Sequence, residues 1–289
     1  MNRKLGGEAR EVGRHHVAQD RQGGDRRSQR PSGSGGPRRP QRDSRGAPRS
    51  SGPNRARPNQ PRSDGDSGER SGPALPPQIE AKQLAPDVRS ELLTLDKSTA
   101  DYVARHLVAA GDLLEENPQK ALEHAQAARG RAGRIAAVRE AVGIAAYHCG
   151  DWAQALSEFR AARRMGSKSA LLPLIADCER GVGRPERAVE LSRTPEAAAL
   201  TGDDADELRI VVAGARSDLG QHEQALAGLS SPPLDSTRTG QTAARLFYVY
   251  ADTLLELGRT ADALQWFIHA AAADLEGLTD AEERITELS

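Results

Sequence analysis

Residues 143–162 read GIAAYHCGDWAQALSEFRAA, and their spacing predicts two short helices packed against each other. Gly143 stands twelve residues before Ala155, with a glycine suited to a turn, Gly150, between them. Phe159 follows the alanine by four residues, so the two share a face of the second helix. Because only a hydrogen or a methyl group fits between closely packed helix axes, we expect Gly143 and Ala155 where the helices come closest. The stretch therefore predicts a helical hairpin.

The same pattern recurs along the chain. The alanine of the second helix recurs at intervals of 34, 33, 37 and 38 residues, and a small residue stands twelve positions before each copy. Four of the five units also have a glycine five positions before the alanine, where a tight turn between helices needs a positive φ. The alanines are Ala121, Ala155, Ala188, Ala225 and Ala263, and the small residues before them are Ala109, Gly143, Ala176, Ala213 and Ala251.

The repeated unit resembles the tetratricopeptide repeat, a helix-turn-helix unit of about 34 residues with small residues at the helix contact. The resemblance runs from about residue 100 to the C-terminus and is strongest in the second and fifth units. It implies an all-α fold, a tetratricopeptide-like α-solenoid of stacked antiparallel helix pairs. The repeats are expected near 101–134, 135–168, 169–204, 205–242 and 243–276, with a C-terminal capping helix at 279–288.

Prolines interrupt the pattern in the third and fourth units. Pro195 and Pro232 stand where the other units have an alanine. Since proline cannot continue the interior of a helix, we expect the second helix of these units to end early. The extra residues, 194–204 and 230–240, are expected to form loops or a short turn.

Signals for helix starts mark both ends of the array. Pro86 suits the first turn of a helix, so order is expected to begin near Ala85. Ser98 or Thr99 is expected to cap the next helix. A capping box from Thr279 to Glu282 would open the last helix. We expect the end helices to cover the outermost core of the array.

Residues 1–74 differ sharply in composition from the rest of the chain. They contain 17 Lys and Arg against 8 Asp and Glu, and only three Val, Leu or Ile residues, whereas residues 75–289 carry a net charge of −10. A segment so poor in apolar residues cannot bury enough surface to offset the entropy of ordering it. We therefore expect a disordered basic arm at 1–77 and a helical repeat domain at 85–289.

The basic charge suggests two roles that the sequence leaves open. The arm can bind the phosphates of RNA, DNA or another polyanion, or it can serve as a solvated extension, and it has no aromatic ring on which a base would stack. Arginines near the ends of two successive second helices form a candidate anion- or RNA-binding patch, although the helix dipole alone also favours arginine there. These are Arg129, Arg131, Arg134, Arg160, Arg163 and Arg164.

The sequence offers no chemistry for catalysis. It has no motif for phosphate binding, zinc-dependent proteolysis or nucleophilic hydrolysis, so we expect no catalytic residue, no cofactor and no metal. Cys149 and Cys178 are too few for a disulfide scaffold and are interpreted as packing residues. No apolar run suggests a secretion signal or a membrane span. A cytoplasmic location is the expectation.

The resemblance also implies a concave groove lined by the first helix of each unit. Some family members clamp a peptide carboxylate there with a Lys and an Asn, and no unit of this chain has that pair. We instead expect a partly acidic groove with two tyrosines, suited to a helix or an extended segment with basic and apolar side chains. The candidate residues are Glu140, Tyr147, Asp177, Arg180, Tyr248 and Asp252.

Together these observations favour a non-enzymatic protein-interaction module whose protein partner the sequence does not identify. An RNA- or ribosome-associated factor, attached through the basic arm and the arginines, is the alternative. An enzyme subunit is a distant third interpretation.

Overall fold

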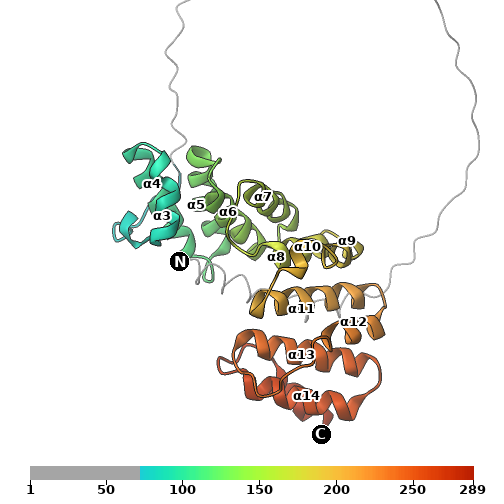
Figure 1. Ribbon diagram of the computed structural model, residues 1–289. Coiled ribbons are helices and arrows are strands. Elements are labelled where there is room, and N and C mark those ends of the chain that lie inside the picture. Colours follow the sequence, from blue (N-terminus) through green and yellow to red (C-terminus); the bar gives the residue numbers. More distant parts are fainter. Residues whose placement is uncertain (1–71) are drawn as a thin grey trace, which may run out of the picture. The chain divides into compact units, whose positions relative to one another are not determined.

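The computed structural model describes residues 72–289, in which all regular structure is helical. Five antiparallel helix pairs follow one another (Figure 1), as predicted, and we call the first helix of each pair its A helix and the second its B helix. The A and B helices are α4 (Lys97–Asp112) and α5 (Pro118–Ala132), α6 (Ala136–His148) and α7 (Trp152–Arg164), α8 (Leu172–Gly181) and α9 (Pro185–Leu191), α11 (Gly202–Asp218) and α12 (His222–Leu229), and α13 (Gln241–Glu256) and α14 (Thr260–Ala273).

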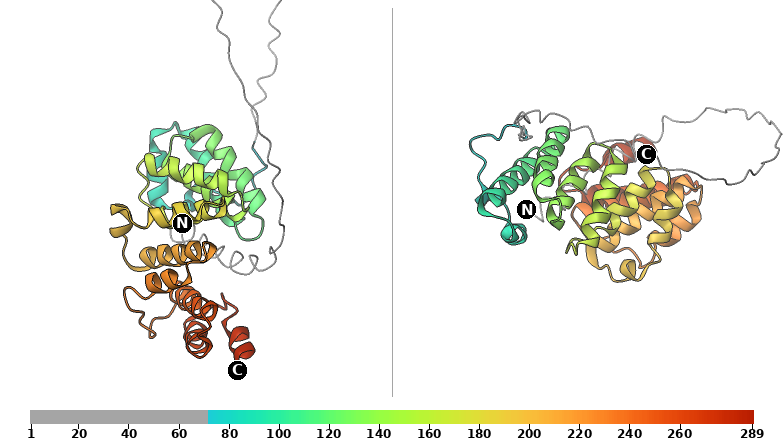
Figure 2. Two further views of the ribbon diagram at one scale, coloured as in Figure 1. Left: turned by 90° about the vertical axis from the view of Figure 1, so that its right-hand side faces the viewer. Right: turned by 90° about the horizontal axis from the view of Figure 1, so that it is seen from above.

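The pairs stack in sequence order. Each A helix packs on its own B helix, and the B helices α5, α7, α9 and α12 each also pack on the A helix of the next unit. Figure 2 shows this succession from two further directions, with colours that follow the chain. The A helix α11 also contacts the A helices on either side of it, α8 and α13. This arrangement is the tetratricopeptide-like stacking of antiparallel helix pairs that the sequence predicts.

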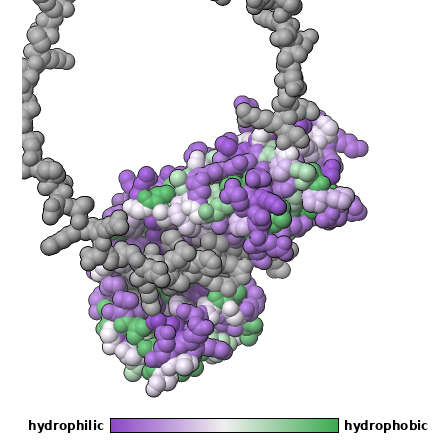
Figure 3. All heavy atoms as spheres, turned by 180° about the vertical axis from the view of Figure 1, so that it is seen from behind, coloured by the Kyte–Doolittle hydropathy of each residue, from purple (hydrophilic) through white to green (hydrophobic). Residues whose placement is uncertain are grey.

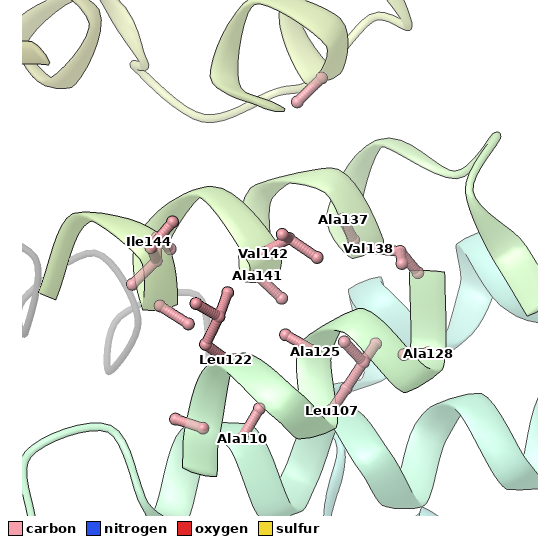
Figure 4. Close-up of a cluster of buried hydrophobic side chains, with 14 of the residues drawn as sticks. Leu107, Ala110, Leu122, Ala125, Ala128, Ala137, Val138, Ala141, Val142 and Ile144 are labelled. Carbon is pink, nitrogen blue, oxygen red and sulfur yellow. The ribbon is translucent and has the colours of Figure 1, made fainter. Parts of the chain in front are cut away.

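The repeated small residues are buried in all five helix pairs. All five repeated alanines have an exposed fraction of 0%. A Cβ atom added at Gly143 would lie 2.6 Å from ring carbons of Phe159, so the close approach in the second pair requires glycine. Figure 4 shows the neighbouring layer of the core, where Leu107 and Leu122 meet Val142 between the first and second pairs.

The turns within the pairs use glycine where the sequence predicts it. Gly150, Gly183, Gly220 and Gly258 have φ between 70° and 76°, a region that side chains disfavour. The first pair lacks this glycine, and its B helix begins instead at Pro118, after Asn117 has capped it by accepting a hydrogen bond from the amide of Lys120.

The two prolines shorten the B helices, which confirms that expectation. Helix α9 ends at Leu191 and α12 at Leu229, in each case before the proline. The segment after α9 is less irregular than expected, because Pro195–Ala198 forms the short helix α10, capped by the Thr194 hydroxyl. Helix α11 also begins at Gly202, inside the expected loop.

Two predicted helix caps are wrong. Asp96, and neither Ser98 nor Thr99, caps α4, because its carboxylate accepts the amides of both residues. The capping box at Thr279 does not form either. Helix α15 (Ala281–Leu288) begins later, and the Asp274 carboxylate takes both the amide and the hydroxyl of Thr279.

The ends of the array are covered as expected, although the packed region begins before Ala85. Ile79 and Leu84 are buried, and the short helix η2 (Ala81–Gln83) packs on α4. Two further short helices follow, α3 (Pro86–Glu91) and η3 (Leu92–Thr94). Glu91 of α3 accepts the Ala137 amide at the start of α6 at 3.1 Å. At the other end α15 packs on α14.

Most of the expected basic arm, residues 1–71, lies outside the described residues. Within 72–289, no helix combines the length and the apolar character needed to cross a bilayer.

Candidate functional site

The candidate groove residues Tyr147 and Asp177 bind each other across two A helices. The Tyr147 hydroxyl in α6 donates a hydrogen bond to the Asp177 carboxylate in α8, and the exposed fractions of the two residues are only 3% and 7%. Burial first, and then the neighbouring carboxylate, raises the pKa of Tyr147 well above its ordinary value. The tyrosine therefore keeps its proton and remains a hydrogen-bond donor.

Arg180 joins the next two A helices. Its Nε and Nη2 donate to the two carboxylate oxygens of Asp218 in α11 at 2.5 and 3.1 Å, and its Nη1 lies 3.7 Å from Asp177. A Cβ atom added at Gly214 would stand 3.1 Å from the guanidinium carbon, so this glycine lets Arg180 lie flat on α11. Such a two-point contact fixes the orientation of both side chains.

A third contact, between α11 and α13, was missed from the sequence. Glu207 accepts hydrogen bonds from Arg245 at 3.0 Å and from the Thr242 hydroxyl at 3.3 Å. Glu207 and Arg245 each stand six residues before the small contact residue of their own unit. Opposite charges at equivalent positions of consecutive repeats are the signal that would have predicted this pair.

Glu140 of α6 contacts the segment that directly precedes α8. Its carboxylate accepts a hydrogen bond from the Ser169 hydroxyl at 2.7 Å, and burial raises its pKa. We call the four contacts between successive units the A-helix seam. It comprises Glu140–Ser169, Tyr147–Asp177, Arg180–Asp218 and Glu207–Arg245.

The two candidates on α13 face the C-terminal helix. An Asp252 carboxylate oxygen lies 3.7 Å from a guanidinium nitrogen of Arg284 in α15. Tyr248 is buried, and burial together with the nearby Asp280 carboxylate raises its pKa. Asp177 and Asp252 are thus each in contact with a neighbouring side chain, and the partly acidic groove stays a prediction.

Most of the candidate arginines are also engaged within the chain. Arg129 and Arg139 both bind the buried Glu158 of α7, at 3.1 and 2.8 Å. Arg160 forms an ion pair with the buried Glu179 of α8, whose other oxygen lies 3.7 Å from Arg184. Each of these glutamates therefore has two arginines from different parts of the chain beside it, which gives those arginines a structural role.

The other four arginines differ in their surroundings. Arg163 lies 3.3 Å from Glu196 of α10, and the guanidinium of Arg131 stands 4.1 Å from the Tyr102 ring centroid, a cation–π contact. Arg134 and Arg164 are exposed, and neither forms an ion pair with a residue in 72–289. Two of the six candidates therefore remain available to an anion, and the RNA-binding patch stays a prediction.

A buried histidine pair lies inside the first helix pair. The Nδ1 atoms of His106 in α4 and His124 in α5 are 2.9 Å apart, so one ring donates and the other accepts. Burial, followed by the charge that His124 would carry, lowers the pKa of His106 to about 4, and burial also lowers the pKa of His124. The pair is therefore neutral near pH 7.

The described region offers no assembled metal site. In residues 72–289 there is no group of three or more His, Cys, Asp or Glu side chains with the spacing of metal ligands. Cys149 and Cys178 are free thiols, and burial raises the pKa of both.

The visible surface is mainly hydrophilic. Figure 3 shows one face, on which hydrophobic residues are scattered among hydrophilic ones outside the grey region. The most exposed large apolar side chains, Leu93 and Leu275, belong to opposite ends of the described chain. Charged and polar groups therefore offer the main features for recognition on this face.

No model of a known protein family and no curated protein matches the sequence. Among solved structures, the chain is similar to YrrB, whose crystal structure is described as that of a tetratricopeptide protein with an unusual peptide-binding site. The two share 15% sequence identity, the match covers 68% of this chain and 96% of YrrB, and the TM-score is 0.40. The fold described above rests on the helix contacts of this chain itself.

Proposed function

We propose that this protein is a non-enzymatic protein-interaction module that binds a peptide or a helix along its A helices. The observation that carries the proposal is the A-helix seam. Side chains from four consecutive A helices hold one another in place through it. A partner that meets side chains already fixed by such contacts loses less conformational entropy on binding.

The charges of the seam indicate the chemistry of the partner. The side chains of Asp218 and Asp252 are 31% and 24% exposed, so a partner on this side of the array can reach both carboxylates. With a net charge of −10 over residues 75–289, the domain attracts basic segments. We therefore infer a partner segment that carries Lys or Arg.

The proposal is tested by neutralising two acidic side chains on the A helices and, in a control variant, two on the B helices. Asp218→Asn combined with Asp252→Asn removes two charges from the A helices. Asp262→Asn combined with Glu190→Gln is the matched control, because these acids also lose an ion pair each but lie on B helices. We expect the first pair of changes to release co-purifying proteins that the control retains, as measured by quantitative mass spectrometry. Equal retention by both variants would refute the proposal.

The RNA-associated alternative depends on residues 1–74 together with Arg134 and Arg164. Deleting residues 1–74 separates the two functions, because the protein-interaction module should keep its protein partner. Loss of salt-sensitive co-purification with nucleic acid on deletion would support the alternative, and unchanged co-purification would exclude it. The cytoplasmic location stays a prediction.

A further inference from the structure

A pocket of about 270 Å³ opens between the third and fourth helix pairs. Its lining includes Arg209, Val212 and Arg216 of α11, Ala198 of α10 and Gly228 of α12. The pocket exists because α9 ends early and α10 and α12 contribute only small side chains there. At 100° per residue, Arg209 and Arg216 lie on the side of α11 away from Gly214 and the A-helix seam.

Arg209 is held rigidly in this pocket. Its Nη1 donates to Asp206 at 2.7 Å, and its Nη2 donates to the carbonyl oxygens of Leu229 and Pro232. Its Nε is buried and forms no hydrogen bond with any residue in 72–289. Arg209 therefore places a fixed, permanent positive charge beside the pocket, while its Nε is enclosed by the protein.

Arg216 has fewer hydrogen-bond partners than Arg209. Its side chain is half-buried and its Nε is fully buried, and it forms no ion pair or hydrogen bond with the part of the chain that the structure describes. Burying an unpaired charge is unfavourable, and a guanidinium cannot lose its proton at ordinary pH. Arg216 thus lines the pocket without a carboxylate partner in residues 72–289, whereas its neighbour Arg209 binds Asp206. Arg129, Arg160 and Arg180 elsewhere in the array each bind a carboxylate as well.

We propose that this pocket binds a carboxylate carried on a small apolar group, with the terminal nitrogens of Arg216 as the donors and the fixed positive charge of Arg209 beside them. The planar guanidinium of Arg216 matches the two oxygens of a carboxylate. Leu208, Val212 and the alanines of the wall would contact the apolar part of the ligand. The pocket is about nine times the volume of one water molecule, roughly 30 Å³, so it has room for a group of several non-hydrogen atoms.

Phosphate fits the donors less well. The Ser192 hydroxyl at the edge of the pocket already donates to the Val189 carbonyl, and the terminal nitrogens of Arg209 are occupied. The donors left over suit one carboxylate better than a dianion with three acceptor oxygens. This site is separate from the A-helix seam, so carboxylate binding can be tested independently of the proposed protein interaction.

Calorimetric titration of the full chain with isovalerate tests the proposal. Isovaleramide, which has the same shape without the charge, and inorganic phosphate are the controls. We expect isovalerate to bind and both controls to bind at least tenfold more weakly. N-acetylvaline, with its amide as control, distinguishes a peptide C-terminus from a free carboxylic acid as the natural ligand. Tighter binding of N-acetylvaline than of isovalerate would indicate a peptide C-terminus. Tighter binding of isovalerate would indicate a free acid. No binding of either carboxylate would overturn the proposal.

Two substitutions locate the binding. Arg216→Gln should weaken isovalerate binding at least tenfold. Gly228→Leu should abolish it by filling the pocket while keeping both arginines, because a Cβ atom at Gly228 meets no heavy atom within 4 Å. Gly130→Leu in α5, which is equally unhindered, is the matched control and should bind normally. Undiminished binding by a folded Gly228→Leu variant would overturn the proposal.

Discussion

The hydroxyl of Tyr147 in α6 donates a hydrogen bond to the carboxylate of Asp177 in α8, thirty positions further along the chain. The bond joins two consecutive A helices and is buried. Tyr147→Phe removes only the hydroxyl and leaves a buried carboxylate short of a donor. We expect the free energy of unfolding to fall by about 1 to 3 kcal/mol, measured by urea denaturation.

A double-mutant cycle with Asp177→Asn separates this bond from other effects of the two changes. The effects of the single substitutions should not add, since both break the same contact. Additive losses in the double variant would mean that the hydrogen bond does not connect the repeats.

The close helix contact at Gly143 predicts that alanine substitutions at Gly143 and at Gly130 have opposite effects on stability. Gly143→Ala places a Cβ atom 2.6 Å from the Phe159 ring and should destabilise the protein, because a well-packed core resists added volume at a cost of about 1 to 3 kcal/mol. Gly130→Ala, in the open on α5, should instead stabilise the protein by about 0.5 to 1 kcal/mol. Thermal melting of both variants provides the check, and a harmless Gly143→Ala would show that the helices are not in close contact there.

The buried histidine pair makes stability depend on pH. The unfolded chain protonates His106 near its ordinary pKa of 6.5, whereas the folded protein does so only near pH 4. Between these values the unfolded state binds more protons, so stability falls as the pH drops, by at most about 1.4 kcal/mol per pH unit for this residue. Stability should be insensitive to this group above pH 6.5.

Denaturation of the wild-type protein and of His106→Gln between pH 7.5 and 4.5 measures this contribution. Carboxylates elsewhere affect both proteins alike, so the difference between the two slopes measures the contribution of His106. The variant should lose less stability on acidification, and parallel curves would contradict the assignment.

The arginines divide into structural and exposed ones. Arg160→Ala leaves the buried Glu179 without its nearest ion-pair partner, so we expect a loss of about 1 to 3 kcal/mol in urea denaturation. Arg164→Ala, four residues later on the exposed surface, should change stability by no more than about 0.5 kcal/mol. A comparable loss in both variants would contradict this division.

The helix pairs could be predicted from the sequence because their packing constrains single positions. Ala121 and Ala263 have to be small because helices meet there, and Gly150 has to adopt a positive φ. The same residue types therefore recur at nearly constant intervals in the sequence, where they can be recognised. The early ends of α9 and α12 followed from Pro195 and Pro232 in the same way.

The candidate site was less predictable because it depends on how neighbouring helices are staggered. Whether Tyr147 faces solvent or contacts Asp177 depends on how far α6 is shifted along α8, and one helical turn is enough to change it. The spacing of the repeats in the sequence does not give this shift. Asp96, Ser98 and Thr99 are all acceptable caps, so only the backbone path shows which residue caps α4. The pocket beside Arg216 arises from side chains that are small in three helices at once.

Site-directed photo-crosslinking tests most directly whether the A helices bind a partner. A benzoylphenylalanine replaces Ser217 in α11, beside the Arg180–Asp218 contact, and in a control chain it replaces the exposed Gln265 of the B helix α14. We predict that the Ser217 position crosslinks in cells to a protein with a basic segment at the crosslinked site, and that the Gln265 position does not. Crosslinks to the same protein from Gln265 alone, or equally from both positions, would contradict the account.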